Sequence, residues 1–146
     1  MPTYFVHASA GRLSPPEKAA IAREITRIHS EATGAQPFFA QVIFQEMRAG
    51  DHFMGGAPVT ADGIFVYGHI RSGRSAERKT LLVRAIVDAI AEVTKMAQRH
   101  IWGYLADLPP RQMIEYGHLL PDPGAEDTWL ESLPPGDRAY LRSLAS

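Results

Sequence analysis

The sequence predicts an α+β fold, a two-layer α/β sandwich in which a β-α-β unit is duplicated. Two alternating apolar segments, residues 2–8 and 63–70, are each followed by an amphipathic helical pattern and then by another strand at a similar offset. The two helical patterns also start alike, with SPPEK at 14–18 and SAERK at 75–79. Helical crossovers make the strands within each half parallel, so we expect one four-stranded sheet with both helices on one face.

The first half, about residues 2–62, opens with a strand that is buried on at least one face. The helix that follows has a strong start signal, because Ser14 is an N-cap, Pro15 fits the first helical position and Glu17 completes a capping box. Gly34 is the expected C-cap. One face of this helix carries Ile21, Ile25 and Ile28.

A second strand covers residues 41–46, and the glycine-rich residues 49–58 indicate a loop or short hairpin. The second half, about residues 63–108, repeats the pattern: Ser75 caps a longer helix, and residues 100–105 form the fourth strand. The apolar face of this helix consists of Leu82, Ala85, Ile86, Ala89, Ile90 and Val93.

Residues 1–146 are expected to form a single domain. The proline-rich residues 109–146 differ in kind from the two halves, with a short amphipathic helix around Trp129 and residues 137–144, and we expect this segment to wrap over the core or a neighbouring subunit. Two helices on one face leave the other face of the sheet bare. An apolar sheet face of this size is ordinarily covered by partner subunits, so packing alone predicts an oligomer.

Composition excludes several functional classes. The 146 residues carry a formal net charge of −1 with mixed signs, so we expect no nucleic-acid partner. The absence of cysteine excludes disulfides and thiolate catalysis, and the six histidines have no metal-ligand spacing, so we expect no metal. No apolar run approaches the length of a membrane span and no signal peptide precedes the first strand. The default expectation is a cytoplasmic protein without a membrane partner.

Pro2 is the first candidate for chemistry. Removal of Met1 would make Pro2 a free secondary amine at the head of an apolar strand, with its ring fixing φ and the direction of the nitrogen lone pair. A terminal amine titrates much closer to neutral pH than a lysine does, so burial and neighbouring charges can set it as an acid or a base. Many chains begin with Met-Pro and make no use of the proline, so the hypothesis depends on what other residues direct at Pro2.

Arg71 and Arg74 stand between a strand and the N-terminus of the second helix. Cations are mildly unfavourable at that helix end, whereas an anion held by guanidinium groups and free backbone N–H groups is favourable there. Arginine forks match a carboxylate, so the pair indicates a binding site for a small carboxylate substrate. The alternative is a solvated pair of surface arginines beside the Ser75 cap.

Three further residues complete the candidate site. His29 lies at the end of the first helix, where the carbonyls favour a protonated ring that donates to an anionic substrate; a structural histidine is the alternative. Tyr104 lies on the fourth strand, and Glu115 follows the double proline at 109–110. A carboxylate with a phenol nearby is a plausible water-activating pair, whereas the alternative for Glu115 is a surface acid.

Taken together, these residues resemble the tautomerase superfamily, and within it the cis-3-chloroacrylic acid dehalogenase group. The resemblance runs over nearly the whole chain, and six separated positions that match in type and order are far more specific than Pro2 alone. The matching positions are Pro2, His29 within IHS at 28–30, the turn at 33–34 with 39–42 and 44–46, RSGRS at 71–75, HIWGY at 100–104 and MIEYG at 113–117.

The resemblance implies a tautomerase-like fold that assembles as a homotrimer, and this assembly would supply the cover for the bare sheet face. It also implies that no cofactor is required. Arg71 and Arg74, helped by His29, would bind the carboxylate of a cis-3-haloacrylate and draw electron density away from C-3.

The resemblance further implies a hydrolytic dehalogenase or hydratase. Glu115, with Tyr104, would activate a water to attack C-3, and protonated Pro2 would deliver a proton to C-2. The resulting halohydrin would collapse to malonate semialdehyde and halide.

The competing activity is keto-enol tautomerisation of phenylpyruvate-like enols with weak dehalogenation, which requires Pro2 as a neutral base. Two nearby arginines lower the pKa of an amine and Glu115 raises it, so the sequence leaves the direction open. The dehalogenase is favoured because Tyr104 and Glu115 would be surplus in a simple tautomerase. The same pair disfavours a malonate semialdehyde decarboxylase, and the combination of Arg71, Arg74 and Glu115 disfavours a non-enzymatic, cytokine-like protein on this fold.

Overall fold

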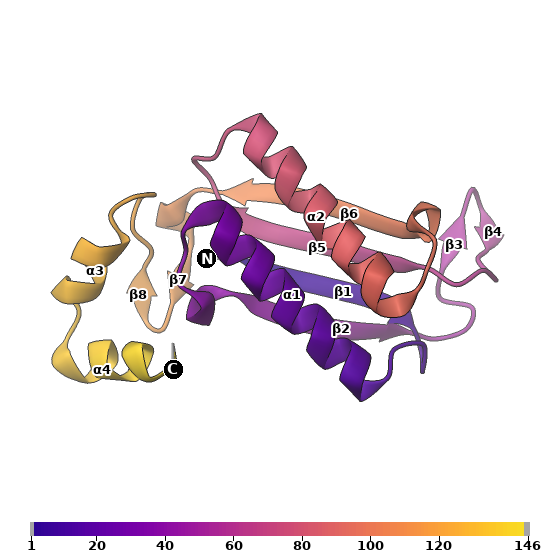
Figure 1. Ribbon diagram of the computed structural model, residues 1–146, viewed down its shortest axis with the longest axis horizontal. Helices are drawn as coiled ribbons and strands as arrows, with labels where there is room; N and C mark the ends of the chain where they lie inside the picture. Colours follow the sequence, from indigo (N-terminus) through magenta and orange to yellow (C-terminus); the bar gives the residue numbers. More distant parts are fainter. Residues whose placement is uncertain (1, 145–146) are drawn as a thin grey trace.

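The computed structural model describes residues 2–144 and contains the duplicated unit (Figure 1). The first half consists of β1 (Thr3–Ser9), α1 (Pro15–Thr33) and β2 (Gln41–Met47), and the second half of β5 (Ile64–Arg71), α2 (Ala76–Thr94) and β6 (Ile101–Leu108). Strands within each half are parallel, and the antiparallel pairing of β1 with β5 joins the halves in the order β2-β1-β5-β6. Both helices cover the same face of the sheet, so the predicted two-layer α+β fold is confirmed (Figure 1).

Both long helices begin where the sequence predicts. Ser14 Oγ accepts a hydrogen bond from the backbone N–H of Glu17, and the Glu17 carboxylate accepts one from the backbone N–H of Ser14 at 2.8 Å. Gly34 ends α1 in the left-handed region with φ of 72°, and its N–H donates to the Ser30 carbonyl. Ser75 caps α2 by accepting from the backbone N–H of Arg78. Local start and stop signals therefore position both helices.

The core lies between the sheet and the two helices. Alternate residues of the central strands point into it, with Tyr4 and Val6 on β1 and Val66 and Ile70 on β5 fully or almost fully buried. The predicted apolar helix faces are buried at Ile21, Ile25, Ile28, Leu82, Ile86 and Ile90, and Ala85, Ala89 and Val93 pack against them. Burial of these faces is what orients α1 and α2 on the sheet.

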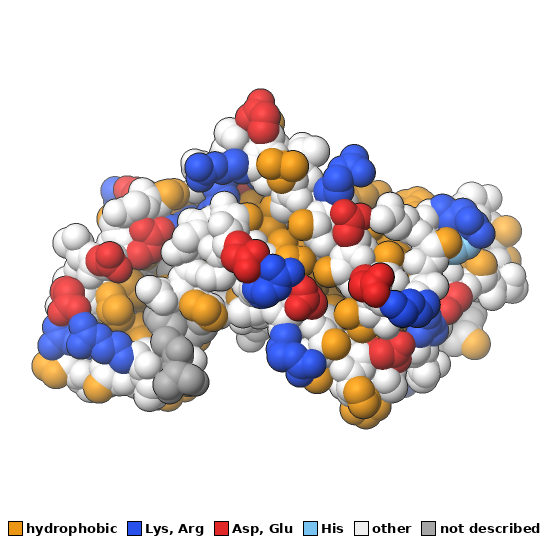
Figure 2. Space-filling view, viewed as in Figure 1, with side chains coloured by type: hydrophobic (Ala, Val, Ile, Leu, Met, Phe, Trp, Pro, Cys, Tyr) orange, Lys and Arg blue, Asp and Glu red, His pale blue; other side chains and the backbone are white. Residues whose placement is uncertain are grey.

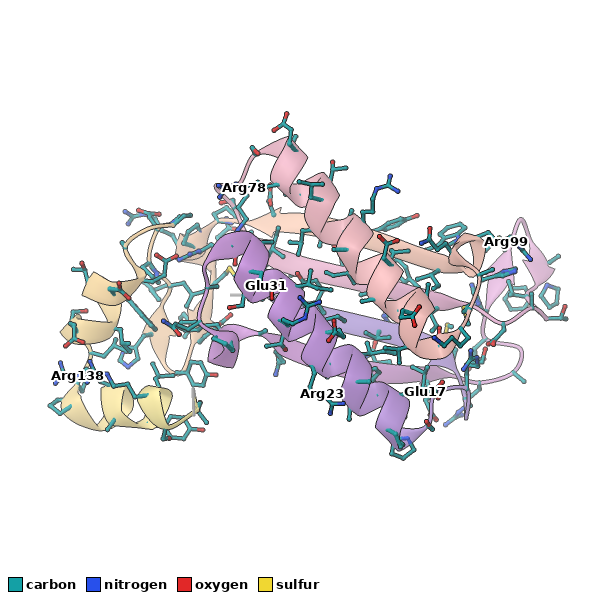
Figure 3. All side chains as sticks on the ribbon, in the orientation of Figure 1. Glu17, Arg23, Glu31, Arg78, Arg99 and Arg138 are labelled. Atoms are coloured by element: carbon teal, nitrogen blue, oxygen red, sulfur yellow. The ribbon has the colours of Figure 1, made fainter. Side chains whose placement is uncertain are left out.

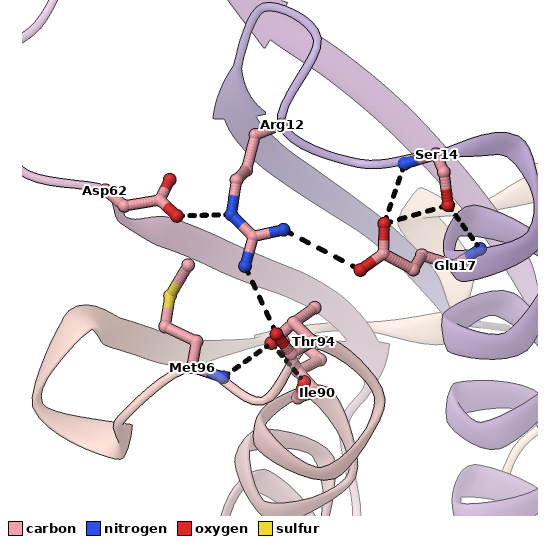
Figure 4. Close-up of polar contacts among 7 residues, drawn as sticks. All are labelled: Arg12, Ser14, Glu17, Asp62, Ile90, Thr94 and Met96. Carbon is pink, nitrogen blue, oxygen red and sulfur yellow. Dashed lines mark hydrogen bonds and ion pairs between the residues drawn. The ribbon is translucent and has the colours of Figure 1, made fainter.

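Arg12, in the loop after β1, connects the two halves at one end of the core (Figure 4). Its guanidinium forms an ion pair with Asp62, donates to the carbonyl of Thr94 at 3.2 Å, and lies 3.7 Å from the Glu17 carboxylate. Thr94 is the last residue of α2, so the cation meets the carbonyl end of that helix, where a positive charge is favourable. No local sequence pattern indicates this long-range contact.

The two faces of the molecule differ in character. On the helix side, acidic and basic side chains lie next to one another over α1 and α2, including the ion pairs of Arg27 with Glu24 and with Glu31 on α1 (Figure 2).

No helix within residues 2–144 is both long and apolar enough to cross a membrane.

The opposite sheet face is aromatic. Trp102 and Tyr104 on β6 are 45% and 51% exposed, and the Tyr104 ring packs edge-on against Phe65 at a centroid separation of 5.1 Å. Phe5 and Tyr67 are half-buried on the same face. This open aromatic face is the one that the sequence predicted to be left bare.

The remaining elements lie at the two ends of the sheet (Figure 1). The predicted loop or hairpin is a hairpin of β3 (Phe53–Met54) and β4 (Ala57–Pro58). At the other end lies the C-terminal segment, residues 109–144. It contains a hairpin of β7 (Ile114–Glu115) and β8 (His118–Leu119), followed by α3 (Glu126–Ser132) and α4 (Pro135–Leu144). A short 3-10 turn at Pro110–Gln112 opens this segment, and two more precede β2 and β6 at Pro37–Phe39 and Gln98–His100.

The structure corrects two local expectations, the number of helices in the tail and the bounds of the fourth strand, and it shows where the C-terminal segment lies. The tail contains two short helices instead of one, because Pro135 starts a new helix. The C-terminal segment covers one end of the sheet, where Phe39, Met113 and Leu120 form a small cluster of their own. The fourth strand starts at Ile101 and extends to Leu108, because His100 ends a 3-10 turn and all eight strand residues pair with β5.

Gly68 on β5 provides a test of this packing. A Cβ at this position would lie 2.5 Å from Tyr4 Cε1 and 2.9 Å from Leu105 Cδ2. We predict that Gly68→Ala lowers the free energy of unfolding by about 1–3 kcal/mol, because the buried Tyr4 ring must move. Urea unfolding at a fixed protein concentration measures the change.

Gly136→Ala is the matched control. It lies in α4 and a Cβ there meets nothing within 4 Å, so we expect unchanged stability or a small gain. Equal unfolding curves for Gly68→Ala and the wild type would contradict the packing described for Tyr4.

Candidate active site

Pro2 lies at the end of the sheet where β1 begins and β5 ends. Because the two strands are antiparallel, with Thr3 opposite His69, the start of β1 lies beside the last residues of β5. Pro2 is buried, and its carbonyl accepts a hydrogen bond of 3.0 Å from the backbone N–H of Gln41 at the start of β2. Pro2, the candidate reactive residue, therefore lies where β1 and β2 begin and β5 ends.

Tyr4 and His29 form a buried polar pair next to this position. The Tyr4 hydroxyl and His29 Nδ1 lie 2.8 Å apart, and the exposed fractions of the two residues are 0% and 2%. Burial raises the pKa of Tyr4, against a smaller opposing effect of Arg74, so the hydroxyl keeps its proton. Sequence reasoning missed Tyr4; its position two residues after Pro2, on the same face of β1, was the available signal.

His29 differs from its predicted state. Burial first, and then the positive charges of Arg74 and Arg71, lower the pKa of its ring to about 3. The expectation of a protonated ring was wrong, because the carbonyl end of α1 is outweighed by desolvation and by two cations. His29 also lies one turn before the end of α1, since its carbonyl accepts from Thr33 Oγ1 at 2.7 Å. A neutral ring still has one donor and one acceptor nitrogen.

Arg71 is not a solvated surface arginine. Its side chain is 1% exposed, its Nη2 forms an ion pair with the Glu126 carboxylate, and its Nη1 donates to the Pro121 carbonyl at 2.5 Å. Burial works against ionisation of Glu126, but the hydrogen bond and charge of Arg71 hold the pKa of this carboxyl below its usual value. Sequence reasoning missed Glu126, because no local pattern links two residues that lie 55 positions apart.

Arg74 lies close to Arg71. Its Nη1 donates to the Arg71 carbonyl at 2.7 Å, and its pKa is lowered by burial and then by the positive charge of Arg71. A cavity of about 560 Å³ opens beside Arg74, between the end of α1 at Gly34, the start of α2 at Arg78, and Glu126 of the C-terminal segment. Figure 3 shows Arg78 at this end of α2. Arg74 and Arg78 therefore border a space that a small anion can enter.

Glu115 lies in β7, half-buried, beside the start of the sheet. It lines a cavity of about 600 Å³ together with Thr3, which follows Pro2, and Gln41, which donates to the Pro2 carbonyl. The structure thus brings Glu115 to the neighbourhood of Pro2, although the two residues are far apart in the sequence.

Tyr104 is not brought to this site within one chain. It pairs in register with Tyr67, which in turn lies opposite Phe5, and its ring stands on the open aromatic face against Phe65. Tyr104 is therefore in register with Phe5, three residues further along the strand direction than Pro2. Tyr104 lies on β6, two strands from β1, whereas Glu115 lines the cavity beside Thr3 and Gln41.

Within residues 2–144, no group of three or more His, Asp or Glu side chains is arranged to hold a metal ion. A carboxylate at Glu115, a neutral imidazole, two guanidinium groups and, once Met1 is removed, an amine at Pro2 can perform proton transfer and anion binding.

Comparisons with known proteins identify a family that matches most of the chain. A family described as "Putative oxalocrotonate tautomerase enzyme" matches residues 1–132. The chain is similar to the crystal structure of N1, a member of the cis-3-chloroacrylic acid dehalogenase (cis-CaaD) family, with 34% identity and a TM-score of 0.92 over 97% of this chain and 99% of that one. It is also similar to native Ps01740, with 29% identity and a TM-score of 0.73 over 77% and 99% of the two chains.

A further similar structure is the Q0 fused 4-OT wild type symmetric trimer, with 25% identity and a TM-score of 0.73 over 81% of this chain and 94% of that one. No curated protein matches the chain.

The neutral state of His29 makes a pH-dependent prediction. An unfolded imidazole takes up a proton near pH 6.5, whereas the folded ring does so only at about 3. The stabilisation from burying the neutral ring is therefore fully present above about pH 6.5 and is lost as the pH falls toward 3. Proton NMR of the ring should show no titration of His29 between pH 8 and pH 5.

His29→Gln is the companion variant. It lacks the titrating ring, so between pH 6.5 and pH 4.5 its free energy of unfolding should fall less steeply than that of the wild type. A His29 ring that titrates near pH 6.5, or equal slopes for both proteins, would show that the ring is not buried as described.

Proposed function

Because the chain belongs to the tautomerase superfamily, and within it to the cis-3-chloroacrylic acid dehalogenase family, we propose that it is a cofactor-independent hydrolytic dehalogenase of cis-3-haloacrylates. Two observations support the proposal: the antiparallel pairing of β1 with β5 places Pro2 beside the end of β5, where Arg71 and Arg74 follow, and Glu115 lines a cavity with Thr3 and Gln41. This arrangement combines an anion-binding group with an amine and a carboxylate that can exchange protons.

The cationic side chains of the site would bind the substrate. Arg74 and Arg71 would hold the substrate carboxylate and withdraw electron density from C-3. The neutral His29 ring would accept a hydrogen bond from the Tyr4 hydroxyl at Nδ1, which leaves its Nε2–H to donate to the same carboxylate. In this role Tyr4 fixes the tautomer of His29, so a neutral imidazole serves where the sequence suggested a charged one.

The chemical step needs one base and one acid. Glu115 would take a proton from a water as its oxygen attacks C-3, and the Pro2 ammonium would give a proton to C-2. The product, a 3-halo-3-hydroxypropanoate, loses halide and a proton to give malonate semialdehyde. All atoms are accounted for without a cofactor.

Tyr104 would take part from a neighbouring subunit. It stands about half exposed on the open aromatic face, which in a homotrimer would be covered by another subunit. One of the similar structures is a symmetric trimer, which supports this assembly. A phenol delivered across such an interface would orient the water for Glu115, so the complete site would exist only in the oligomer.

Keto-enol tautomerisation of phenylpyruvate-like enols remains the second candidate. The matching family description names a tautomerase, and cations close to an amine favour its neutral form, as Arg71 and Arg74 would near the start of β1. A neutral Pro2 would then act as the base, and Glu115 would not be required.

The proposed function is tested by halide release from cis-3-chloroacrylate, using protein whose mass shows that Met1 has been removed. We predict that Pro2→Ala and Glu115→Gln each lower kcat by at least about a hundredfold, the usual size of a general acid or base contribution. An ion-selective electrode or a coupled assay for malonate semialdehyde measures the rate.

Glu46→Gln, the same chemical change at the far end of β2, is the control and should leave kcat within about twofold. Negligible halide release by the wild type would overturn the dehalogenase proposal. Rapid ketonisation of phenylenolpyruvate that depends on Pro2 but not on Glu115 would then establish the second candidate.

A further inference from the structure

The duplicated fold contains a second cavity that corresponds to the one beside Pro2. The cavity beside Pro2 is lined by Thr3, which opens β1, by residues at the start of β2 and by the β7–β8 hairpin. The second cavity is lined by Ile64, which opens β5, by residues at the start of β6 and by the β3–β4 hairpin. The two cavities therefore occupy equivalent places at opposite ends of the sheet (Figure 1).

The second cavity lacks the groups that would exchange protons at the first. Gly63 precedes β5 where Pro2 precedes β1, and an internal glycine has no amine to titrate. Met54 is the second residue of β3, the place that Glu115 holds in β7. A thioether is only a weak hydrogen-bond acceptor and carries no proton. A ligand of the second cavity would therefore be bound and released unchanged.

The lining of the second cavity suits a flat apolar group. The cavity has a volume of about 640 Å³, and three aromatic side chains, Phe53, Phe65 and Trp102, line it. Phe53 and Trp102 are each about half exposed. An aromatic ring bound against them would remove apolar surface from water, and a cavity of this size with mostly apolar walls is typical of a small-molecule site.

One cation at this cavity has no counter-charge. Arg99 lines the cavity, is exposed, and makes no ion pair or hydrogen bond with another residue of the part of the chain that the structure describes (Figure 3). Asp62 is the one carboxylate among the lining residues, and it is already paired with the Arg12 guanidinium. The charge that the cavity offers to a ligand is therefore positive, and a guanidinium matches a carboxylate.

We propose that this cavity is a second, non-catalytic binding site, and that its ligand is an aromatic monocarboxylate. The ring would lie against the aromatic side chains that line the cavity, and the carboxylate would meet Arg99. The proposal does not depend on the proposed function, because none of the residues that carry it belongs to the site at Pro2.

Two probes with the same ring separate the effect of the ring from that of the charge. Indole-3-acetate carries a carboxylate, and indole-3-acetamide carries an uncharged amide in its place. Titration calorimetry in excess acrylate, which has no ring and competes for the arginines near Pro2, gives the Kd and stoichiometry of each probe. We expect one indole-3-acetate per chain, with a Kd below about 1 mM.

Arg99→Gln removes the charge and should weaken indole-3-acetate by about fivefold, while the Kd of indole-3-acetamide stays within about twofold. Arg84→Gln is the matched control, because Arg84 is exposed on α2, on the helix side of the sheet. It should leave both Kd values within about twofold. Phe53→Ala should weaken both probes alike, because it removes part of the surface that the ring contacts. Thermal unfolding curves check that each variant is folded.

The absence of binding by the wild type up to about 1 mM would overturn the proposal, and a neighbouring subunit that fills the cavity would give this result. Equal weakening of the two probes by Arg99→Gln, or equal effects of Arg99→Gln and Arg84→Gln, would overturn it as well. These titrations need no turnover. Negligible halide release would therefore sink the dehalogenase alone, and halide release without binding of the indole probe would sink only the second site.

Discussion

The buried pair of Arg71 and Glu126 is the interaction on which the arrangement of the candidate active site depends. A guanidinium that is 1% exposed is tolerated only if a counter-charge and hydrogen-bond acceptors enter the interior with it. Glu126 and the Pro121 carbonyl supply both from the C-terminal segment. This pair joins the end of β5 to the C-terminal segment, whose strands β7 and β8 form a separate two-stranded sheet.

The duplicated fold explains why the site lies at this end. The antiparallel pairing of β1 with β5 places the start of a strand from one half beside the end of the equivalent strand from the other half. Pro2 comes from the first half, Arg71 and Arg74 from the second, and α1 carries His29 over the junction. Neither half alone contains both the amine and the guanidinium groups, so the chemistry depends on how the halves are paired.

Sequence reasoning predicted what local patterns determine. The caps at Ser14, Gly34 and Ser75, the buried helix faces and the order of the elements all follow from short-range signals, and each is present in the structure. The expectations that failed involve contacts between distant residues. The protonation state of His29 depends on burial and on Arg74 and Arg71 from the second half of the chain. Glu126, the ion-pair partner of Arg71, lies 55 residues further along the sequence. Tyr104 was predicted on the right strand, but only the register of β6 shows which face and level it occupies.

The central claim is that Pro2, once Met1 is removed, is a reactive amine beside a carboxylate-binding group. Treatment with 3-bromopropiolate, an electrophilic carboxylate, followed by peptide mass spectrometry, tests this claim most directly. The account predicts one adduct per chain, on Pro2, and slower labelling in the presence of acrylate, which competes for Arg71 and Arg74. A processed chain whose Pro2 stays unmodified, or one labelled on another residue at the same rate with and without acrylate, would contradict it.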